Sequence, residues 1–279
     1  MRTIHADIIA KAVKEMVIKA NTDLGADVVA AFEKGLKDEA SPVGQAVFKT
    51  LIKNAEIAAT EQAPICQDTG MAVFFVELGQ DVHIEGALLQ EAIDEGVRQG
   101  YAEGYLRKSI CDPFTRVNTK DNTPSVVLVE MVKGDKLKIT AAPKGGGSEN
   151  MSRLTMLAPS AGKKGIVDFV VKRCEEAGSN PCPPVIVGVG IGGSAEKCMT
   201  NAKKALLRKI GAPNPDKELA ELEAEMLEKI NALGMGPQGL GGLVYAMAVH
   251  IEKHPCHIAS LPVAVNICCH ASRHKEATL

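Results

Sequence analysis

The sequence has no tryptophan, three tyrosines and six phenylalanines in 279 residues. Proteins that bind single strands of nucleic acid stack the bases on such side chains, so a platform of that kind is excluded. The chain also lacks an excess of basic charge, because its formal net charge is −2 with both signs interspersed. We therefore expect no binding of nucleic acid and no binding to a membrane surface.

Long apolar runs are absent as well. No segment is apolar over the length that a bilayer requires, and the first twenty residues alternate charged and apolar positions without a secretory cleavage site. These absences predict a cytoplasmic protein. In a reducing compartment the eight cysteines would stay thiols or bind metal rather than form disulfides.

Apolar side chains recur at helical spacing along much of the chain. Residues 5–59 predict three amphipathic helices, with breaks near Asn21–Gly25 and at Ser41-Pro42. Further helices are expected at residues 86–104, 164–177, 195–210 and 216–233. Short β-prone segments predict buried strands at residues 72–78 and 184–189.

Two pairs of β-prone segments are each joined by a polar turn. Residues 124–132 and 136–142 flank Lys133–Asp135 and predict a hairpin that leads to the glycines at 145–147. Residues 243–251 and 258–269 predict a second pair. Because no repeat, low-complexity tract or linker interrupts the chain, we expect one helix-rich α+β domain over residues 1–279.

The loop Pro64–Gly70 carries a thiol, an amide, a carboxylate and a hydroxyl just before a predicted strand. Polar groups between apolar elements must be hydrogen-bonded or used in chemistry. A turn in which Asp68 bonds to nearby backbone and Cys66 is merely buried is an equally good interpretation. Arg107 has two interpretations as well, a solvated cation or a planar fork that binds a carboxylate.

The segment Gly188–Gly193 fits the glycine pattern of a dinucleotide site, since it follows a predicted strand and precedes a predicted helix. A nucleotide fold next needs a second parallel strand that ends in an acidic residue. The sequence continues instead with Asn214-Pro215 and another charged helix. A nucleotide-binding oxidoreductase is therefore the weaker hypothesis.

Histidines and cysteines crowd residues 250–274. They are His250, His254, Cys256, His257, Cys268, Cys269, His270 and His274. No Cys-x2-Cys pair typical of a structural zinc site is present, and a zinc-binding protein without catalysis is a further hypothesis. Cys111, Cys174 and Cys198 lie in or beside helical patterns and are interpreted as small core residues.

Four motifs, read in order, resemble those of the iron–sulfur-dependent class I fumarate hydratase family. They are Pro64–Gly70, Lys144–Ser148, Cys182-Pro183-Pro184 followed by Gly190–Gly193, and Cys269–Arg273. The resemblance covers nearly the whole chain and is to the separate alpha subunit of the two-subunit form. It implies the α+β fold of that family's N-terminal domain, with a small and mainly antiparallel sheet.

The resemblance also implies a site. A [4Fe–4S] cluster would be held by Cys66, Cys182 and Cys269, with Cys268 as the rival for the third position. The family's active-site histidine lies twelve positions before the third cysteine, which selects His257. The implied substrate-binding residues are Gln67, Asp68, Arg107, Gly145, Gly146 and His257. Asp68 and His257 would be catalytic, beside an iron with an open position that acts as a Lewis acid.

The implied reaction is the reversible hydration of fumarate to (S)-malate, a hydro-lyase reaction of the tricarboxylic acid cycle on a small dicarboxylate. In this family a beta subunit carries further carboxylate-binding groups, so we expect a hetero-oligomer and no turnover by this chain alone. The related L-tartrate dehydratases share the subunit plan, and Pro64-Ile65 and Lys144–Ser148 favour the fumarate branch. Mesaconate is also admissible, because one methyl group changes binding by only about 1–3 kcal/mol.

Overall fold

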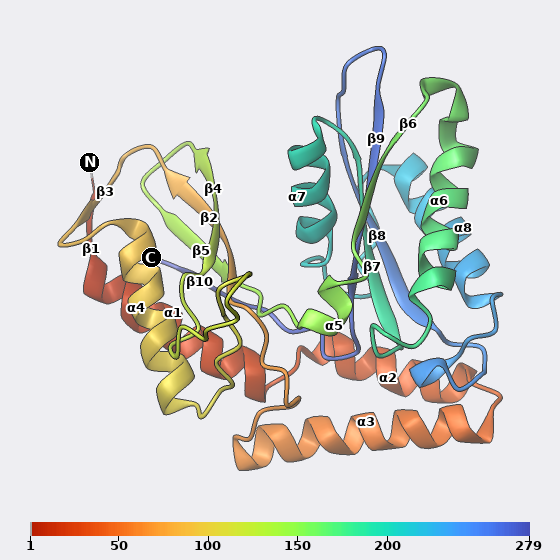
Figure 1. Cartoon of the computed structure of the whole chain (residues 1–279), viewed down its shortest axis with the longest axis horizontal. Coiled ribbons are helices and arrows are strands. Elements are labelled where there is room, and N and C mark those ends of the chain that lie inside the picture. Colours follow the sequence, from red (N-terminus) through yellow and green to blue (C-terminus); the bar gives the residue numbers. More distant parts are fainter. Residues whose placement is uncertain (1) are drawn as a thin grey trace. The chain divides into compact units, whose positions relative to one another are not determined.

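The three N-terminal helices begin and end where the apolar spacing is interrupted. In the computed structural model, which describes residues 2–279, they are α1 (Ala6–Thr22), α2 (Ala26–Asp38) and α3 (Pro42–Glu61) (Figure 1). α1 buries Ile9, Val13 and Val17, which lie on one stripe because they are four residues apart. The prediction of three amphipathic helices in this part of the chain is confirmed.

The chain forms two compact units, each built from separate stretches of sequence. Unit 1 consists of Met1–Gly25, Asn54–Gly146 and Arg273–Leu279, and unit 2 consists of Ala26–Lys53 and Gly147–Ser272. Because the two units interleave along the sequence, no single linker separates them. The expectation of one domain over residues 1–279 stays a prediction.

Unit 1 contains a four-stranded sheet in the order β10-β5-β2-β4. Its strands are β2 (Val73–Gly79), β4 (Val126–Val132), β5 (Leu137–Ala141) and β10 (Lys275–Thr278). α1 packs against α4 (Leu89–Glu103), and both helices share one apolar core with β2 and β5. A separate parallel pair is formed by β1 (Arg2–His5) and β3 (Val82–Glu85). The loop with the candidate site residues therefore leads into a central, buried strand.

Unit 2 contains a second four-stranded sheet, in the order β6-β9-β7-β8. Its strands are β6 (Arg153–Leu157), β7 (Val185–Gly192), β8 (Ala246–His254) and β9 (Leu261–Cys268). The helices are α5 (Gly146–Glu149), whose first residue is the last of a unit 1 stretch, η1 (Pro159–Ala161), α6 (Gly162–Ala177), α7 (Ala195–Ala205), α8 (Lys217–Asn231) and η2 (Pro237–Gly239). α6 and α8 share a core with one face of β7, whereas α7 covers its other face (Figure 1).

Both predicted strand pairings are wrong, although the strands themselves are present. β2 lies between β4 and β5, and β7 lies between β8 and β9. All eight residues of β7 are buried. Burial of this strand is most complete when it has a partner strand on each edge and a covering layer on each face. The short edge strands β6 and β10 had not been predicted either.

The predicted α+β class is confirmed, and antiparallel strand pairs are in the majority. β5 pairs antiparallel with β2 and with β10, and β9 pairs antiparallel with β6 and with β7. Parallel pairs are β1-β3, β2-β4 and β7-β8. In place of the single small sheet that the resemblance implied, residues 2–279 form three sheets: one of four strands in each unit, and the β1-β3 pair in unit 1.

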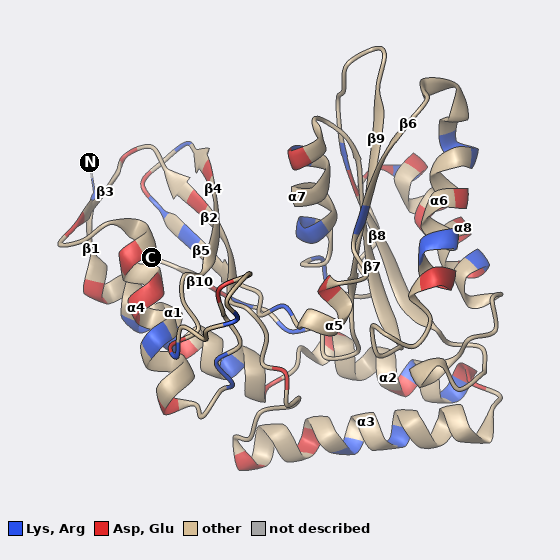
Figure 2. Cartoon of the chain, in the orientation of Figure 1, with Lys and Arg blue, Asp and Glu red and all other residues tan. Residues whose placement is uncertain are grey.

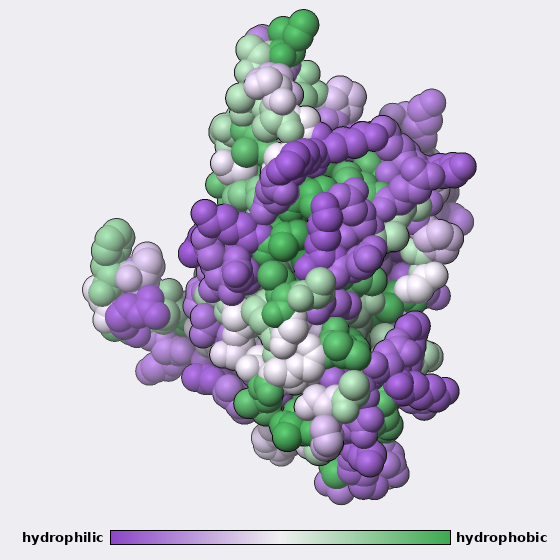
Figure 3. Space-filling view, turned by 90° about the vertical axis from the view of Figure 1, so that its right-hand side faces the viewer, coloured by the Kyte–Doolittle hydropathy of each residue, from purple (hydrophilic) through white to green (hydrophobic). Residues whose placement is uncertain are grey.

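Basic and acidic residues are interspersed along the helices, strands and loops of each unit (Figure 2). On the face of unit 2 seen in Figure 3, hydrophilic side chains surround a smaller area of hydrophobic ones. None of the helices in residues 2–279 combines the length and the apolar character that crossing a membrane requires.

His250 is a buried histidine in β8. It is 3% exposed, and its Nδ1 atom lies 3.2 Å from the carbonyl oxygen of Ala205 at the end of α7. Burial, together with the nearby guanidinium of Arg208, lowers the pKa of His250 from 6.5 to about 4. The folded state therefore holds this imidazole neutral.

Acidification should destabilise the chain through His250. The unfolded chain protonates a histidine near about pH 6.5, so the stabilisation is complete above that pH and is lost as the pH falls through the folded pKa. Between about pH 7 and pH 4 we expect this group to remove roughly 2–3 kcal/mol from the free energy of unfolding. Urea unfolding of the wild type and of His250→Leu measures the effect, and an equal pH dependence in both proteins would contradict it.

Candidate functional site

The loop Cys66–Gly70 in unit 1 is held in place by buried polar side chains. The hydroxyl of Tyr101 donates toward the carbonyl oxygens of Thr69 and Gly70, each 3.0 Å away. Nδ2 of Asn122 also donates to the Gly70 carbonyl, at 3.2 Å. Burial raises the pKa of Tyr101, so its hydroxyl keeps the proton that it donates. The loop is thus ordered by contacts made beneath the residues that carry the chemistry.

Asp68 is oriented by two backbone N–H groups. Its Oδ1 accepts from Gly70 at 3.0 Å and its Oδ2 accepts from Gly146 at 2.8 Å. A Cβ atom on Gly145 would lie 3.2 Å from Oδ2, so this stretch approaches the carboxylate closely. Nη2 of Arg273 donates to the Asp68 carbonyl oxygen at 2.5 Å. Main chain and side chain of Asp68 are both fixed.

Arg107 lies beside the same loop. Its Nη1 donates to Oε1 of Gln67 at 2.7 Å, and this pair of side chains is exposed. Its backbone N–H donates to the Thr69 hydroxyl at 2.9 Å, and that hydroxyl donates to the Arg107 carbonyl at 3.1 Å. A guanidinium has five N–H donors, so others can bind a carboxylate ligand. Unit 1 thus brings together these sequence-predicted residues: Cys66, Gln67, Asp68, Arg107, Gly145 and Gly146.

Unit 2 brings Cys182 and Cys269 to one end of its sheet. Cys182 precedes β7 and Cys269 follows β9, and these strands are antiparallel neighbours. The backbone N–H of His270 donates to the Cys182 carbonyl at 3.3 Å, and the His270 Nδ1 lies 3.0 Å from the same oxygen. Cys182 is exposed and Cys269 is half-buried. Across residues 2–279, no three His, Cys, Asp or Glu side chains are gathered around one metal position.

The other cysteines have different surroundings, and the described chain has no disulfide. Cys268 is 8% exposed and packs in an apolar cluster with Ile186 and Leu206. Burial raises the thiol pKa of Cys174 to about 12 and that of Cys198 to about 11, so both stay protonated. The interpretation of these two as core residues is confirmed, whereas Cys111 is only half-buried.

His257 lies at the opposite end of β9 from Cys269. It belongs to the exposed turn between β8 and β9, where its Nδ1 accepts from the backbone N–H of Ala259 at 3.1 Å. The eight residues of β9 separate this turn from Cys269, a span of about 25 Å at roughly 3.3 Å per residue. The spacing of twelve positions that selected His257 therefore does not bring these two residues together within one copy of unit 2.

The glycines of the dinucleotide-like pattern serve the packing of α7 on β7. A Cβ atom on Gly188 would lie 2.1 Å from the Ala202 carbonyl oxygen, and one on Gly190 would lie 2.0 Å from that of Cys198. A second parallel strand does follow β7 after two helices: it is β8, which had been predicted as a strand but as the partner of the segment 258–269. The local arrangement resembles a nucleotide fold, but close contact between helix and strand already accounts for Gly188 and Gly190.

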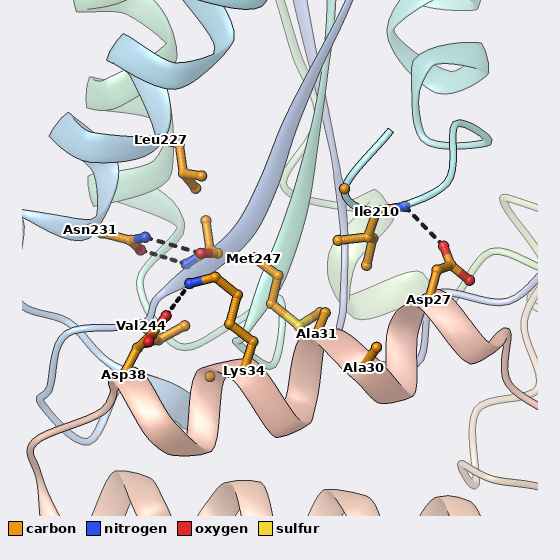
Figure 4. A pocket seen from close by; sticks show the side chains of 13 residues that line it. Asp27, Ala30, Ala31, Lys34, Asp38, Ile210, Leu227, Asn231, Val244 and Met247 are labelled. Carbon is orange, nitrogen blue, oxygen red and sulfur yellow. Dashed lines mark hydrogen bonds and ion pairs between the residues drawn. The ribbon is translucent and has the colours of Figure 1, made fainter. Parts of the chain in front are cut away.

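Unit 2 also has a cavity of about 360 Å³ between α2, α8 and the start of β8 (Figure 4). Asp27 accepts from the backbone N–H of Ile210 at 2.9 Å, and Lys34 pairs with Asp38. Asn231 bonds to the backbone at residues 245 and 246. Because these polar groups already have partners, the cavity offers no set of converging groups for a ligand.

Sequence reasoning missed Tyr101, Asn122 and Arg273 as supports of the Cys66–Gly70 loop. Arg273 was inside one of the four motifs, and its position four residues after Cys269 was the available signal. Its Nε and Nη1 atoms are buried and have no hydrogen-bond partner. Tyr101 and Asn122 carried no signal, because their role depends on α4 and on the loop that follows it.

The chain matches a known protein family over almost its whole length. The family model described as fumarate hydratase (Fumerase) matches residues 10–278. The chain belongs to this family. An archaeal relative from Methanocaldococcus jannaschii, provisionally named L(+)-tartrate dehydratase subunit alpha, is 44% identical over 271 residues, which is 95% of each chain.

Bacterial relatives have the same subunit name. The L(+)-tartrate dehydratase subunit alpha of Escherichia coli K12 is 38% identical over 251 residues, covering 88% of this chain and 82% of the relative. That of Shigella sonnei has the same identity and coverage. The chain is thus an alpha subunit of the hydro-lyase family that includes fumarases and tartrate dehydratases.

Proposed function

We propose that the chain is the alpha subunit of a fumarate hydratase that interconverts fumarate and (S)-malate. The observation that carries this proposal is the loop Cys66–Gly70, where a carboxylate held by two N–H groups lies in the same short segment as an amide paired with an exposed arginine. Such a set can bind a dicarboxylate and move a proton. Membership of the fumarate hydratase family supports the reaction class.

Arg107 and Gln67 would bind one substrate carboxylate. The guanidinium is exposed and offers parallel N–H groups, and its bond to Gln67 limits the directions it can take. The N–H of Gly146 already donates to Asp68. We therefore assign the glycine loop mainly to the orientation of Asp68, and Gly145 and Gly146 would affect the substrate through that carboxylate.

Asp68 would transfer the proton. Its two oxygens accept from Gly70 and Gly146, and each retains a lone pair that can accept a proton from water or from the substrate. His257 is the second proposed catalytic residue. Because β9 separates it from Cys269 of its own copy, we propose that it serves the site of another copy of the chain. Unchanged turnover in His257→Ala would remove it from the mechanism.

Cys66, Cys182 and Cys269 would hold a [4Fe–4S] cluster. When bound, this group supplies an iron with an open position that polarises the substrate hydroxyl. The donor set fits such a group: none of the three thiols is in a disulfide, none is buried in an apolar core, and two lie at one end of the unit 2 sheet. The rival Cys268 instead packs among apolar side chains.

A beta subunit would complete the site. The similar proteins are named as alpha subunits, which supports a partner chain and a hetero-oligomer. We expect no turnover from this chain alone, even with its cluster. Fumarate hydration by the isolated, cluster-loaded chain would overturn that part of the proposal.

Dehydration of L-tartrate is the second candidate reaction, and the names of the similar proteins favour it. The experiment is anaerobic purification with the beta subunit, analysis of iron and acid-labile sulfide, and assays with fumarate, mesaconate and L-tartrate. Substitution of Cys66, Cys182 or Cys269 by serine should remove the cluster and at least about 99% of turnover, because the cluster depends on its thiolate ligands. Cys268→Ser should keep both.

Other results would support other classes. A colourless protein with one bound zinc ion would support the hypothesis of a zinc-binding protein without catalysis. Tight binding of NAD would support the hypothesis of a nucleotide-binding oxidoreductase. A cluster with turnover of L-tartrate only would replace fumarate as the substrate and leave the hydro-lyase assignment intact.

A further inference from the structure

The turn Gly234–Gly239 breaks the helical pattern after α8, and the proposed reaction gives it no role. Its residue Gln238 has a φ of +55°, a left-handed conformation that is costly for a residue other than glycine. The backbone N–H and the side-chain Nε2 of Gln238 donate to the same acceptor, the carbonyl oxygen of Pro183, at 2.9 and 2.6 Å. Pro183 directly follows Cys182.

The carbonyl of Cys182 has two donors as well. Both come from His270, through the backbone N–H at 3.3 Å and the ring Nδ1 at 3.0 Å. A carbonyl oxygen only accepts, so the ring contact is a hydrogen bond in the tautomer that has its hydrogen on Nδ1. His270 directly follows Cys269, so these two contacts connect the backbone of Cys182 to the residue next to the other proposed cluster ligand.

Cys182 itself is in the left-handed region, with a φ of +54°. Its backbone N–H donates to the Ser179 carbonyl at 3.0 Å, so main-chain groups at this residue and at the next are hydrogen-bonded. The exposed thiol is thereby left with little freedom beyond rotation about its own side-chain bond. Groups that orient a ligand in this way affect metal affinity without touching the metal.

The chain on the C-terminal side of this turn is fixed by contacts within unit 2. Glu39, 1% exposed, accepts from the backbone N–H groups of Leu243 and Val244, at 2.8 and 2.9 Å from its Oε2. A Cβ atom on Gly236 would lie 2.3 Å from the Gly241 carbonyl, so the turn is in close contact with the residues that follow it. Gln238 therefore projects from a well-supported segment.

We propose that Gln238 and His270 are positioning residues that preorganise Cys182 as a cluster ligand. This inference rests on the proposed function and deepens it by adding two residues that act on the cluster through Cys182. Its competitor is a purely structural turn, in which the same hydrogen bonds stabilise unit 2 and have no effect on the cluster.

Gln238→Gly separates the two explanations. Glycine keeps the backbone donor and relieves the left-handed conformation, but it removes the Nε2 donor. We expect a thermal midpoint of the cluster-free chain equal to or above that of the wild type. We also expect cluster loss in air to be roughly fivefold faster, the factor that one net hydrogen bond contributes to an equilibrium.

The matched control is Gln62→Gly in unit 1. Gln62 has a similar left-handed φ, +53°, and its Nε2 also donates to a backbone carbonyl, that of Ala59 at 2.6 Å. This substitution should leave the rate of cluster loss unchanged.

The second positioning residue is tested with two variants. His270→Asn retains an N–H donor at the position of Nδ1, so its rate of cluster loss should equal that of the wild type. His270→Ala removes this donor, so it should lose the cluster faster.

The measurements are iron and sulfide content over time, and paramagnetic resonance of the cluster, on the complete enzyme prepared anaerobically. A Gln238→Gly protein with the wild-type resonance spectrum and rate of cluster loss would overturn the inference. Faster loss that the Gln62→Gly control reproduces would do the same. A wild-type chain that binds no iron would instead refute the proposed function, so the two failures are distinct.

Discussion

Asp68→Asn should lower turnover of the complete enzyme by about 10²- to 10⁴-fold, the usual contribution of a positioned acid–base group. The substitution hardly changes the size of the side chain, but it replaces one oxygen by an NH2 group. Both carboxylate oxygens accept from backbone N–H groups, those of Gly70 and Gly146. The NH2 group of an asparagine must therefore face one of these two backbone N–H groups, and two donors cannot bond to each other. Steady-state kinetics with fumarate and (S)-malate measure the effect.

A second aspartate provides the control for this substitution. Asp112 also accepts from backbone N–H groups, those of Phe114 and Thr115, but through Oδ1 alone. Asp112→Asn retains that oxygen and should leave turnover unchanged. If Asp68→Asn kept more than about a tenth of wild-type turnover, proton transfer by Asp68 would be ruled out, since general acid–base groups contribute more than this.

The helices were predictable from sequence because each carries its own signal. α1, α2 and α3 have apolar stripes of helical period, and their ends coincide with Asn21–Gly25 and Ser41-Pro42. α8 begins after Asp216, whose side chain accepts from the N–H groups of Glu218 and Leu219. Local rules determine these elements, so no tertiary information was needed.

Strand partners could not be predicted in the same way. A short turn joins β4 to β5, yet β2, a strand from much earlier in the sequence, lies between them. The turn between β8 and β9 is equally uninformative, because β7 separates these strands. Turn composition reports only a change of chain direction, whereas strand order depends on which buried strand needs two neighbours.

The candidate site was predictable only where its residues are close in sequence. Gln67 and Asp68 share one loop, and the structure adds Arg107 and Gly146 to it through hydrogen bonds. The family resemblance, rather than spacing, had indicated those two residues. His257 stays a prediction of the resemblance, and the eight residues of β9 lie between it and Cys269 of the same copy.

Gly190→Ala should destabilise unit 2 by about 3 kcal/mol or more, because overpacking at a site that cannot relax reaches this range. The added Cβ atom would lie 2.0 Å from the Cys198 carbonyl oxygen, a backbone atom of α7. β7 cannot move away, since Gly190 is paired with Glu252 of β8 on one side and Ala264 of β9 on the other. Urea unfolding of the cluster-free chain measures the change.

Gly193→Ala is the comparison that separates packing from nucleotide binding. Gly193 lies in the turn after β7 with a φ of +75°, and a Cβ atom there would meet the side chain of Lys197 at 3.0 Å. We expect a loss of only about 1 kcal/mol from the backbone conformation. A dinucleotide site would use all these glycines alike, so wild-type stability in Gly190→Ala with lost NAD binding would favour that function. If both substitutions lower only the free energy of unfolding, and Gly190→Ala lowers it more than Gly193→Ala, the glycine pattern serves the close packing of α7 on β7.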